Sequence, residues 1–193
     1  MKLNVNEIFY SLQGEGGRMG EASIFIRLTQ CNLTCSFCDT DFATGKDMSI
    51  DEILEAIKIY PCKWIIWTGG EPTIQLKDKY LVRFKEAGYK QAIETNGTRK
   101  VPSLIDYISC SPKKNYGLVK MITPSVDEIR IPLKKGEKLP DISVLPRAGR
   151  YLISPIFDGN AINQENIDYC LGLVKANPEW SLSIQMHKLI HIE

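Results

Sequence analysis

The sequence lacks the features that would place the protein in a membrane or on a nucleic acid. No apolar run approaches the ~20 residues that span a bilayer, and the first seven residues lack the apolar core of a signal peptide. With 24 Lys and Arg against 23 Asp and Glu, the chain also lacks the excess of cations that a broad nucleic-acid-binding face needs. We therefore expect a cytoplasmic protein that binds neither membranes nor, directly, nucleic acids.

Internal repeats and low-complexity tracts are absent as well. The 193 residues have the length of one ordinary domain, so we expect a single domain over residues 1–193. Hydrophobic residues make up 44% and charged residues 24% of the chain, which is typical of a globular protein and excludes a disordered one. Because the cytoplasm is reducing, the six cysteines are interpreted as thiols or ligands before they are interpreted as disulfides.

Apolar, strand-like runs alternate with helical stretches, which is the pattern of parallel βαβ units. Strands are predicted at residues 22–28, 64–67, 89–94, 106–110, 128–131, 151–153 and 181–185, and helices at 49–60, 76–87 and 163–176. No convincing helix lies in residues 132–150, and the chain is shorter than the ~250 residues of a full eight-unit barrel. We therefore predict the α/β class with a truncated, partial barrel.

Polar segments follow the predicted strands. They are residues 29–38, 68–72, 95–97, 111–113 and 187–188. The carboxyl ends of parallel barrel strands all point to one mouth, where the chemistry of such folds takes place. The sequence therefore predicts that these five segments converge on one site.

Three cysteines form the strongest local signal. Cys31, Cys35 and Cys38 lie within eight residues of a predicted loop. Three thiolates can bind an iron–sulfur cluster and leave one iron open, because cubane clusters usually take four cysteines. The alternatives are a zinc site completed by a distant His or Cys, or three unrelated thiols. The other cysteines are interpreted as small core residues. They are Cys62, Cys110 and Cys170.

The cysteine spacing C-x3-C-x2-C, with an aromatic residue before the third cysteine, resembles the cluster loop of radical S-adenosylmethionine (SAM) enzymes. Residues 67–72, Trp-Thr-Gly-Gly-Glu-Pro, resemble the second motif of that superfamily, whose backbone meets the methionine part of SAM. Glycine lets a backbone approach a ligand closely. The resemblance implies a (β/α)6-like radical SAM barrel with a [4Fe–4S] cluster on Cys31, Cys35 and Cys38.

Four further segments narrow the resemblance to one family. Residues 10–16 (Tyr-Ser-Leu-Gln-Gly-Glu-Gly), 38–40 (Cys-Asp-Thr), 111–113 (Ser-Pro-Lys) and 185–188 (Gln-Met-His-Lys) resemble the 7-carboxy-7-deazaguanine synthases. The resemblance implies a carbon–nitrogen lyase of queuosine and deazapurine biosynthesis. It would convert 6-carboxy-5,6,7,8-tetrahydropterin, called the carboxypterin below, to 7-carboxy-7-deazaguanine with release of ammonia. The radical would come from SAM, so no side chain is assigned a catalytic role.

The resemblance also assigns ligand contacts, residue by residue. The implied substrate contacts are Leu12, Gln13, Gly14, Glu15, Arg27, Thr68, His187 and Glu193. The implied SAM contacts are Phe37, Cys38, Asp39, Gly70, Glu94, Ser111, Pro112, Lys113 and Ser154. Thr40 is the implied Mg²⁺ ligand. Ser154 departs from the family's usual glutamine and Glu193 from its usual terminal proline. The family also implies an external electron donor, such as flavodoxin or ferredoxin, and a homodimer.

Arg27 has a physical argument of its own. It lies in a predicted strand on the face opposite Ile24, Ile26 and Leu28. If these three side chains pack against helices, Arg27 points into the barrel, where a guanidinium needs a carboxylate or several acceptors. The substrate carboxylate meets that need. The alternative is a structural ion pair with an internal glutamate.

Two other functions remain open from the sequence. One is a glycyl-radical activase, which would share the cysteine spacing and the Gly-Gly-Glu-Pro segment but act on a protein. The other is a small non-enzymatic zinc-binding domain. Local alternatives also remain: Asn96-Gly97 is an ordinary turn pair, and Lys113 could be a solvated surface cation.

Overall fold

A computed structural model of the protein describes residues 2–35, 38, 42–113 and 125–192. The strands span Lys2–Leu12 (β1), Ala22–Leu28 (β2), Lys46–Ser49 (β3), Trp64–Gly69 (β4), Lys90–Thr95 (β5), Tyr107–Cys110 (β6), Ser125–Leu133 (β7), Arg147–Pro155 (β8) and Trp180–Leu182 (β9). The α-helices span Ile50–Ile57 (α1), Asp78–Glu86 (α2), Gln164–Ala176 (α3) and Met186–Ile190 (α4).

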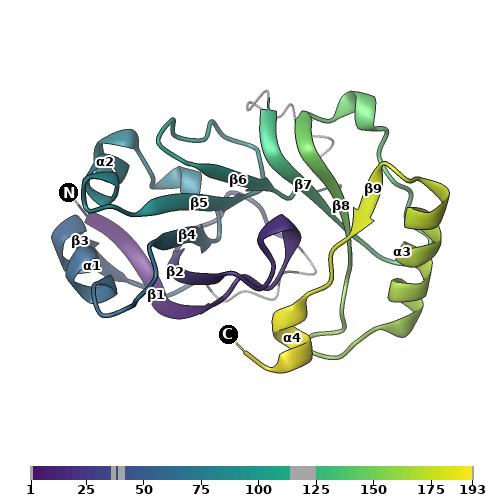
Figure 1. Cartoon of the computed structure of the whole chain (residues 1–193), viewed down its shortest axis with the longest axis horizontal. Helices are drawn as coiled ribbons and strands as arrows, with labels where there is room; N and C mark the ends of the chain where they lie inside the picture. The colour runs from purple at the N-terminus through teal and green to yellow at the C-terminus, as the bar shows by residue number, and fades with distance from the viewer. Residues whose placement is uncertain (1, 36–37, 39–41, 114–124, 193) are drawn as a thin grey trace.

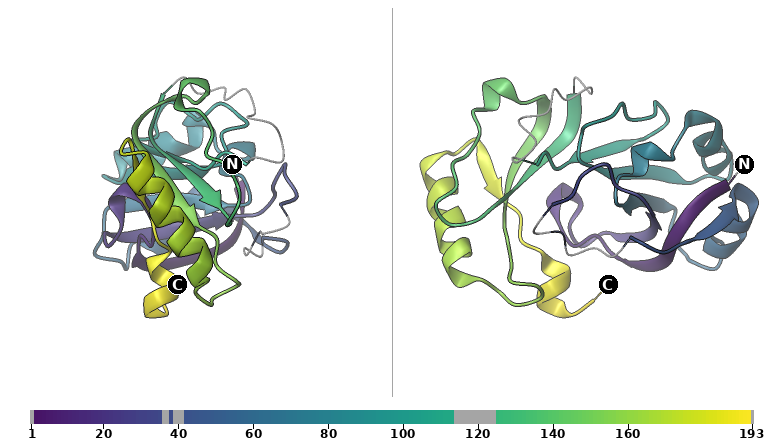
Figure 2. Two further views of the ribbon diagram at one scale, coloured as in Figure 1. Left: turned by 90° about the vertical axis from the view of Figure 1, so that its right-hand side faces the viewer. Right: turned by 180° about the vertical axis from the view of Figure 1, so that it is seen from behind.

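The nine strands of the described residues form one curved sheet, in the order β3-β1-β2-β4-β5-β6-β7-β8-β9 (Figures 1 and 2). From β2 to β9 in this order, neighbouring strands are parallel, whereas β1 pairs antiparallel with β2 and with β3. In the described residues β3 and β9 do not pair, so the sheet is open. This α/β partial barrel confirms the predicted fold class.

The start of α1 follows from local sequence. The Ser49 hydroxyl accepts a hydrogen bond from the Glu52 backbone N–H at 3.2 Å, and the Glu52 carboxylate accepts one from the Ser49 N–H at 2.7 Å. This reciprocal cap satisfies two N–H groups that have no partner inside the helix, and such an N-cap contributes about 1 kcal/mol. Burial of Ile50, Ile53 and Ile57 then fixes which face of α1 meets the sheet.

Strand β2 divides its side chains between two environments. Ile24, Ile26 and Leu28 are fully buried in a core cluster shared with α1 and α2. Phe25, on the other face, packs with Ile66 and Ala92 in a separate cluster. Figure 1 shows α1 and α2 together at one end of the sheet and α3 at the other. The alternation predicted for this strand is therefore correct, and Arg27 lies on the face away from these helices.

Three parts of the sheet differ from the sequence prediction, and the first is β3, which was not predicted. The sequence analysis did not predict β1, because a register shift between Val5 and Glu7 interrupts its alternation of buried and exposed residues. The predicted last strand, 181–185, ends at Leu182 and is followed by α4. The Ser183 N–H still pairs with the Ile153 carbonyl at 2.8 Å, but the chain then turns into the helix that contains His187.

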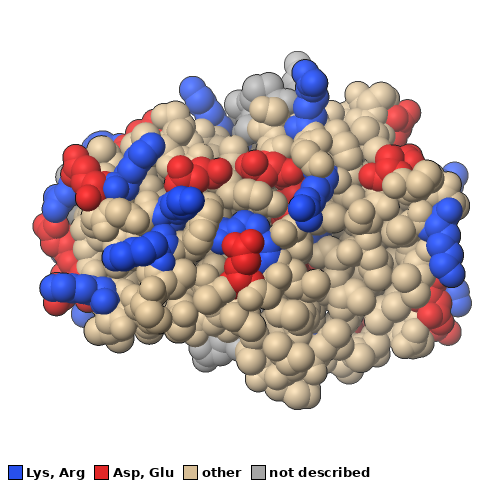
Figure 3. Space-filling model, viewed as in Figure 1, with Lys and Arg blue, Asp and Glu red and all other residues tan. Residues whose placement is uncertain are grey.

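The surface charge and the helices of the described residues are consistent with what the composition predicts. On the face drawn in Figure 3, Lys and Arg side chains lie among Asp and Glu side chains and do not form a region of one sign. No helix among the described residues has the length and apolar character needed to cross a bilayer.

Candidate active site

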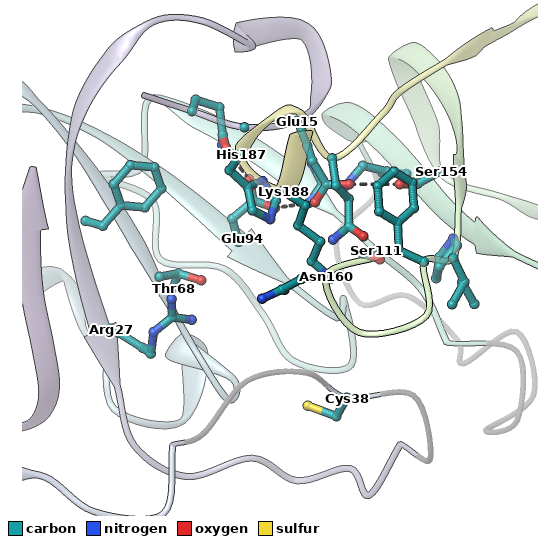
Figure 4. A pocket seen from close by; sticks show the side chains of 18 of the residues that line it. Glu15, Arg27, Cys38, Thr68, Glu94, Ser111, Ser154, Asn160, His187 and Lys188 are labelled. Atoms are coloured by element: carbon teal, nitrogen blue, oxygen red, sulfur yellow. Dashed lines mark hydrogen bonds and ion pairs between the residues drawn. The ribbon is translucent and has the colours of Figure 1, made fainter. Parts of the chain in front are cut away.

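The polar segments that follow the strands line one pocket of about 1290 Å³ (Figure 4). They come from the loop after β1, from the carboxyl ends of β4, β5, β6 and β8, and from α4. Pockets that hold one drug-sized ligand are roughly 300–1,000 Å³. This pocket therefore has room for more than one small molecule.

Most residues predicted to bind ligands line this pocket. They are Leu12, Gln13, Gly14, Glu15, Arg27, Cys38, Thr68, Gly70, Glu94, Ser111, Lys113, Ser154 and His187. Cys31, Cys35 and the buried Pro112 lie outside the described lining. Phe37, Asp39, Thr40 and Glu193 lie outside the residues that the structure describes.

The cysteine loop carries three thiols, and within the described part of the chain none of them forms a disulfide. The Cys38 N–H donates to the Cys35 carbonyl at 3.2 Å, and Cys31 Sγ accepts from the Leu33 N–H at 3.4 Å. Burial raises the pKa of Cys31 and of Cys35, and the nearby Lys113 opposes this rise in the pKa of Cys35. Metal binding would have to offset that cost, because the ligand is the thiolate.

The donor set of this loop fits an iron–sulfur cluster. Within the described part of the chain, no three His, Cys, Asp or Glu side chains are grouped as a single metal ion would require. In a cubane each thiolate binds its own iron, so the three sulfurs need not meet at one point. Cys38 lies across the pocket from Glu15 and Ser154 (Figure 4).

The two glycines of the Gly-Gly-Glu-Pro segment are required by the end of β2 and by the start of the cysteine loop. Gly69 has a φ of +133°, and a Cβ there would overlap the Leu28 carbonyl. A Cβ on Gly70 would overlap the Gln30 carbonyl and the Cβ of Cys31. The Glu71 N–H donates to the Gln30 carbonyl at 2.8 Å. The two motifs therefore pack directly against each other.

Gly70→Ala is expected to displace the cysteine loop, because its methyl group has no space against the backbone of Gln30. Overpacking of this kind costs typically about 1–3 kcal/mol of stability. We expect a lower Tm and less iron bound after anaerobic reconstitution. Gly172→Ala, in α3 with open space around it, is the matched control and should be stabilised by about 0.5–1 kcal/mol. Wild-type iron content in Gly70→Ala would contradict the prediction.

Glu71 links the loop after β4 to the end of β5 by hydrogen bonds, and it does not line the pocket. Its Oε1 accepts from the Thr73 and Thr95 hydroxyls at 2.6 and 2.8 Å, and its Oε2 accepts from the Asn96 N–H at 2.7 Å. Asn96 in turn donates to the Asn32 side chain at 3.1 Å. Asn96 is thus more than a turn residue: it joins the end of β5 to the cysteine loop and lines the pocket.

Arg27 lies at one side of the pocket, next to Thr68 (Figure 4). Its Nε donates to Glu7 Oε1 at 2.5 Å, so the ion pair raised as the alternative is present. The pair is not deeply buried, since the Arg27 side chain is 20% exposed and that of Glu7 is 46% exposed. Among the described residues no acceptor pairs with the two terminal nitrogens of Arg27. These nitrogens are the part of the fork that can bind a ligand carboxylate.

Sequence reasoning missed Arg130, which lines the inner wall of the pocket. Its Nη2 lies 2.7 Å from Glu94 Oε2. Burial raises the pKa of Glu94, although Arg130 acts in the opposite direction. The signal that singled out Arg27 was available here too, because Arg130 is a charged residue between two apolar strand residues, Ile129 and Ile131.

Lys113 is not a freely solvated cation. Its Nζ donates to the Ser111 hydroxyl at 2.8 Å, and both residues line the pocket. Burial lowers the pKa of Lys113, and the charge of Arg130 lowers it further. The end of β6 therefore brings a desolvated cation to the side of the pocket that adjoins the cysteine loop.

The C-terminal segment closes on the loop after β1. The Met186 N–H donates to the Gly14 carbonyl at 2.8 Å, and the Gly16 N–H donates to the Ser183 hydroxyl at 2.9 Å. A Cβ on Gly14 would overlap the ring of His187. Gly14 is thus required by the close approach of His187, and the two residues line the pocket together.

Comparison with known proteins gives consistent results. The family model of the Radical SAM superfamily matches residues 25–130. The 7-carboxy-7-deazaguanine synthase of Bacteroides thetaiotaomicron is 41% identical over all of both chains, and that of Haemophilus influenzae is 42% identical over 98% of this chain and 94% of its own. The crystal structure of QueE from Escherichia coli superposes with a TM-score of 0.77 at 26% identity, covering 97% of this chain and 95% of that one.

Proposed function

The chain belongs to the 7-carboxy-7-deazaguanine synthase family of radical SAM enzymes, and from this premise we propose how its pocket binds the reactants. Membership implies a [4Fe–4S] cluster and SAM as cofactors. The reaction is the conversion of the carboxypterin to 7-carboxy-7-deazaguanine with loss of ammonia. The observation that supports this assignment is one pocket with Cys38 on one side and the Arg27 and Glu15 side chains on the others.

The cofactors would be held on the side of the cysteine loop. Cys31, Cys35 and Cys38 would hold the cluster, which together with SAM supplies a radical that removes a hydrogen atom from the substrate. Gly70, Ser111 and Lys113 line the pocket next to this loop, which supports them as contacts for SAM. Phe37, Asp39, Pro112, Glu94 and Ser154 complete the proposed set.

The substrate would lie between Arg27 and Glu15. Arg27 would bind the carboxylate with its two terminal nitrogens while Glu7 holds Nε at the correct angle. The stacked rings of Phe9 and Phe25, whose centroids are 4.8 Å apart, line the pocket beside Arg27 and would shield a carboxylate bound there from water.

The remaining contacts would surround the ring system of the pterin. Gln13 and Glu15 offer polar groups to its nitrogen-rich edge, and Leu12, Gly14, Thr68 and His187 complete the lining. Ser154 donates to Glu15 Oε1 at 2.8 Å, so we propose that it also orients Glu15. Ile192 lines the pocket, which supports a contact between the terminal Glu193 and the substrate.

Thr40→Ala is expected to lose the dependence of the rate on Mg²⁺ and to keep the cluster, because we propose that the Thr40 hydroxyl is a Mg²⁺ ligand. Mg²⁺ prefers about six oxygen ligands and often keeps water or substrate among them, so one protein hydroxyl is compatible with such a site. The measurement is the rate as a function of Mg²⁺ concentration, with iron content determined on the same samples. Identical metal response curves for Thr40→Ala and wild type would show that Thr40 is not the ligand.

We also propose the partners that this chemistry requires. The cluster must be reduced for each reaction, so an external one-electron donor such as flavodoxin or ferredoxin is expected. We further expect a homodimer in the cytoplasm, and light scattering of the reconstituted protein would test the dimer.

One experiment tests the function. The reconstituted protein is incubated anaerobically with reductant, SAM and the carboxypterin, and 7-carboxy-7-deazaguanine is detected by mass. Omission of SAM is the control. Cleavage of SAM without this product, together with activity on a partner protein, would instead support the activase alternative. The synthase name of the relatives favours neither that alternative nor the zinc-binding domain.

A further inference from the structure

At one side of the pocket, one guanidinium lies among three carboxylates. We call these four residues the Arg130 cluster: Arg130, Glu15, Glu94 and Glu128. Arg130 Nη2 lies 2.7 Å from Glu94 Oε2 and 3.5 Å from Glu15 Oε2, and Nη1 lies 3.5 Å from Glu128 Oε1. The Arg130 side chain is 11% exposed. Its position is therefore fixed by these contacts and by the protein packed around it.

The three glutamates of the cluster face different surroundings. Glu128 is 2% exposed and accepts from the Gly17 N–H at 2.6 Å and from the Tyr107 hydroxyl at 2.9 Å. Glu15 and Glu94 line the pocket, whereas Glu128 is outside its described lining. Glu128 thus anchors Arg130 from the protein interior, and Arg130 holds the other two carboxylates at the pocket surface.

Of the three glutamates, Glu15 has the most unused capacity to accept hydrogen bonds. Glu94 accepts from Gln13 Nε2 at 2.9 Å through Oε1, and from Ser109 and Arg130 at 2.9 and 2.7 Å through Oε2. Glu15 accepts from Ser154 through Oε1, while its Oε2 has the 3.5 Å contact with Arg130. Since each carboxylate oxygen accepts about two hydrogen bonds, Glu15 can accept further N–H donors from a ligand.

We propose that Arg130 is a positioning residue that determines substrate specificity. It fixes the Glu15 carboxylate, with Glu94 beside it, so that the pocket selects a ring edge with two adjacent N–H donors. The 2-amino-4-oxopyrimidine part of a pterin carries such an edge. The inference rests on the proposed function and adds to it the group that makes the pocket select this edge.

The charge of the cluster supports the same conclusion. One guanidinium does not balance three carboxylates, and burial already raises the pKa of Glu94. Two N–H donors from a ligand would replace the hydrogen bonds that the Glu15 carboxylate loses when the ligand displaces water. A site built to hydrogen-bond a ligand discriminates strongly against an analogue that lacks the donor, because a buried polar group then has no partner.

The test compares the carboxypterin with its 2-deamino analogue on anaerobically reconstituted enzyme in the presence of SAM. We expect wild type to bind the analogue on the order of 10- to 100-fold more weakly, where each factor of ten corresponds to about 1.4 kcal/mol. In Glu15→Gln and Arg130→Met the ratio of the two Kd values should approach one. Arg130→Lys keeps the charge but loses the fork, so its ratio should be intermediate.

Controls separate a positioning role from a structural one. Glu165→Gln, which removes the surface partner of Lys135, should keep the wild-type ratio. Uncoupled cleavage of SAM without pterin should also stay within about twofold of wild type in Glu165→Gln, because that residue lies outside the proposed binding sites. A purely structural Arg130 would lower the Tm and leave the ratio unchanged.

Three outcomes would overturn the inference. The first is a wild-type ratio in Glu15→Gln, which keeps the Arg130 cluster folded even if Arg130→Met does not fold. The second is a wild-type ratio in Arg130→Lys. In both cases wild type still converts the carboxypterin, so the proposed function stands. The third, wild type that neither binds nor converts the carboxypterin, would overturn the proposed function together with the inference.

Discussion

Cys35→Ala is expected to abolish turnover and to remove most of the bound iron. Cys35 lies between Cys31 and Cys38, and none of the three thiols forms a disulfide among the described residues. Cubane clusters usually take one thiolate per iron, and the remaining two thiolates cannot hold a cluster in the required geometry. The measurements are iron and sulfide content and the visible absorption after anaerobic reconstitution. Cys31→Ala and Cys38→Ala should give the same result.

Cys170→Ala is the matched control for these variants. Cys170 lies in α3 and its thiol is fully buried in a core cluster, so the substitution should cost on the order of 1 kcal/mol of stability. Cluster content and turnover should stay at the wild-type level. Equal iron content in Cys35→Ala and wild type would refute the assignment of the cluster to this loop.

Arg27→Ala is expected to weaken binding of the carboxypterin by on the order of 30-fold or more. Loss of one partner of a desolvated charge pair costs roughly 2–5 kcal/mol, and each 1.4 kcal/mol is about tenfold in affinity. Cluster assembly and SAM binding should be nearly unchanged, since neither needs this cation. The measurement is the Kd for the carboxypterin together with the Tm of the same variant.

Two further variants separate substrate binding from the ion pair with Glu7. Arg27→Lys keeps the charge but loses the planar fork, so affinity should still fall. Glu7→Gln removes the structural partner and leaves the guanidinium, so affinity should fall much less than in Arg27→Ala. A lower Tm with unchanged affinity in Arg27→Ala would show that the ion pair is structural and that Arg27 does not bind the substrate.

Local sequence was sufficient wherever one short segment contains the whole pattern. The alternation of Ile24, Ile26 and Leu28 predicted both the strand and the face that packs against α1 and α2. The helix predicted over residues 49–60 begins where Ser49 and Glu52, only three residues apart, cap α1. The prediction failed for β1, where the register shift at Val5 and Glu7 breaks the period of two on which strand prediction depends.

The sequence alone was enough to find the cysteine spacing, the Gly-Gly-Glu-Pro segment and the family that these motifs indicate. These are properties of residues close together in the chain, so no fold is needed to find them. It also placed the polar segments after the strands, from which one common site followed.

The charges that meet across the pocket could be identified only from the folded chain. Glu15 lies in the loop after β1 and Glu94 in β5, and both meet Arg130 of β7 because the order of the sheet brings β5, β6 and β7 together beside that loop. The same is true of Gly14, which must be glycine because His187 packs against it from the other end of the chain. Such contacts depend on the order of the strands in the sheet and on the packing of the C-terminal segment against the loop after β1. No local pattern of residues therefore predicts them.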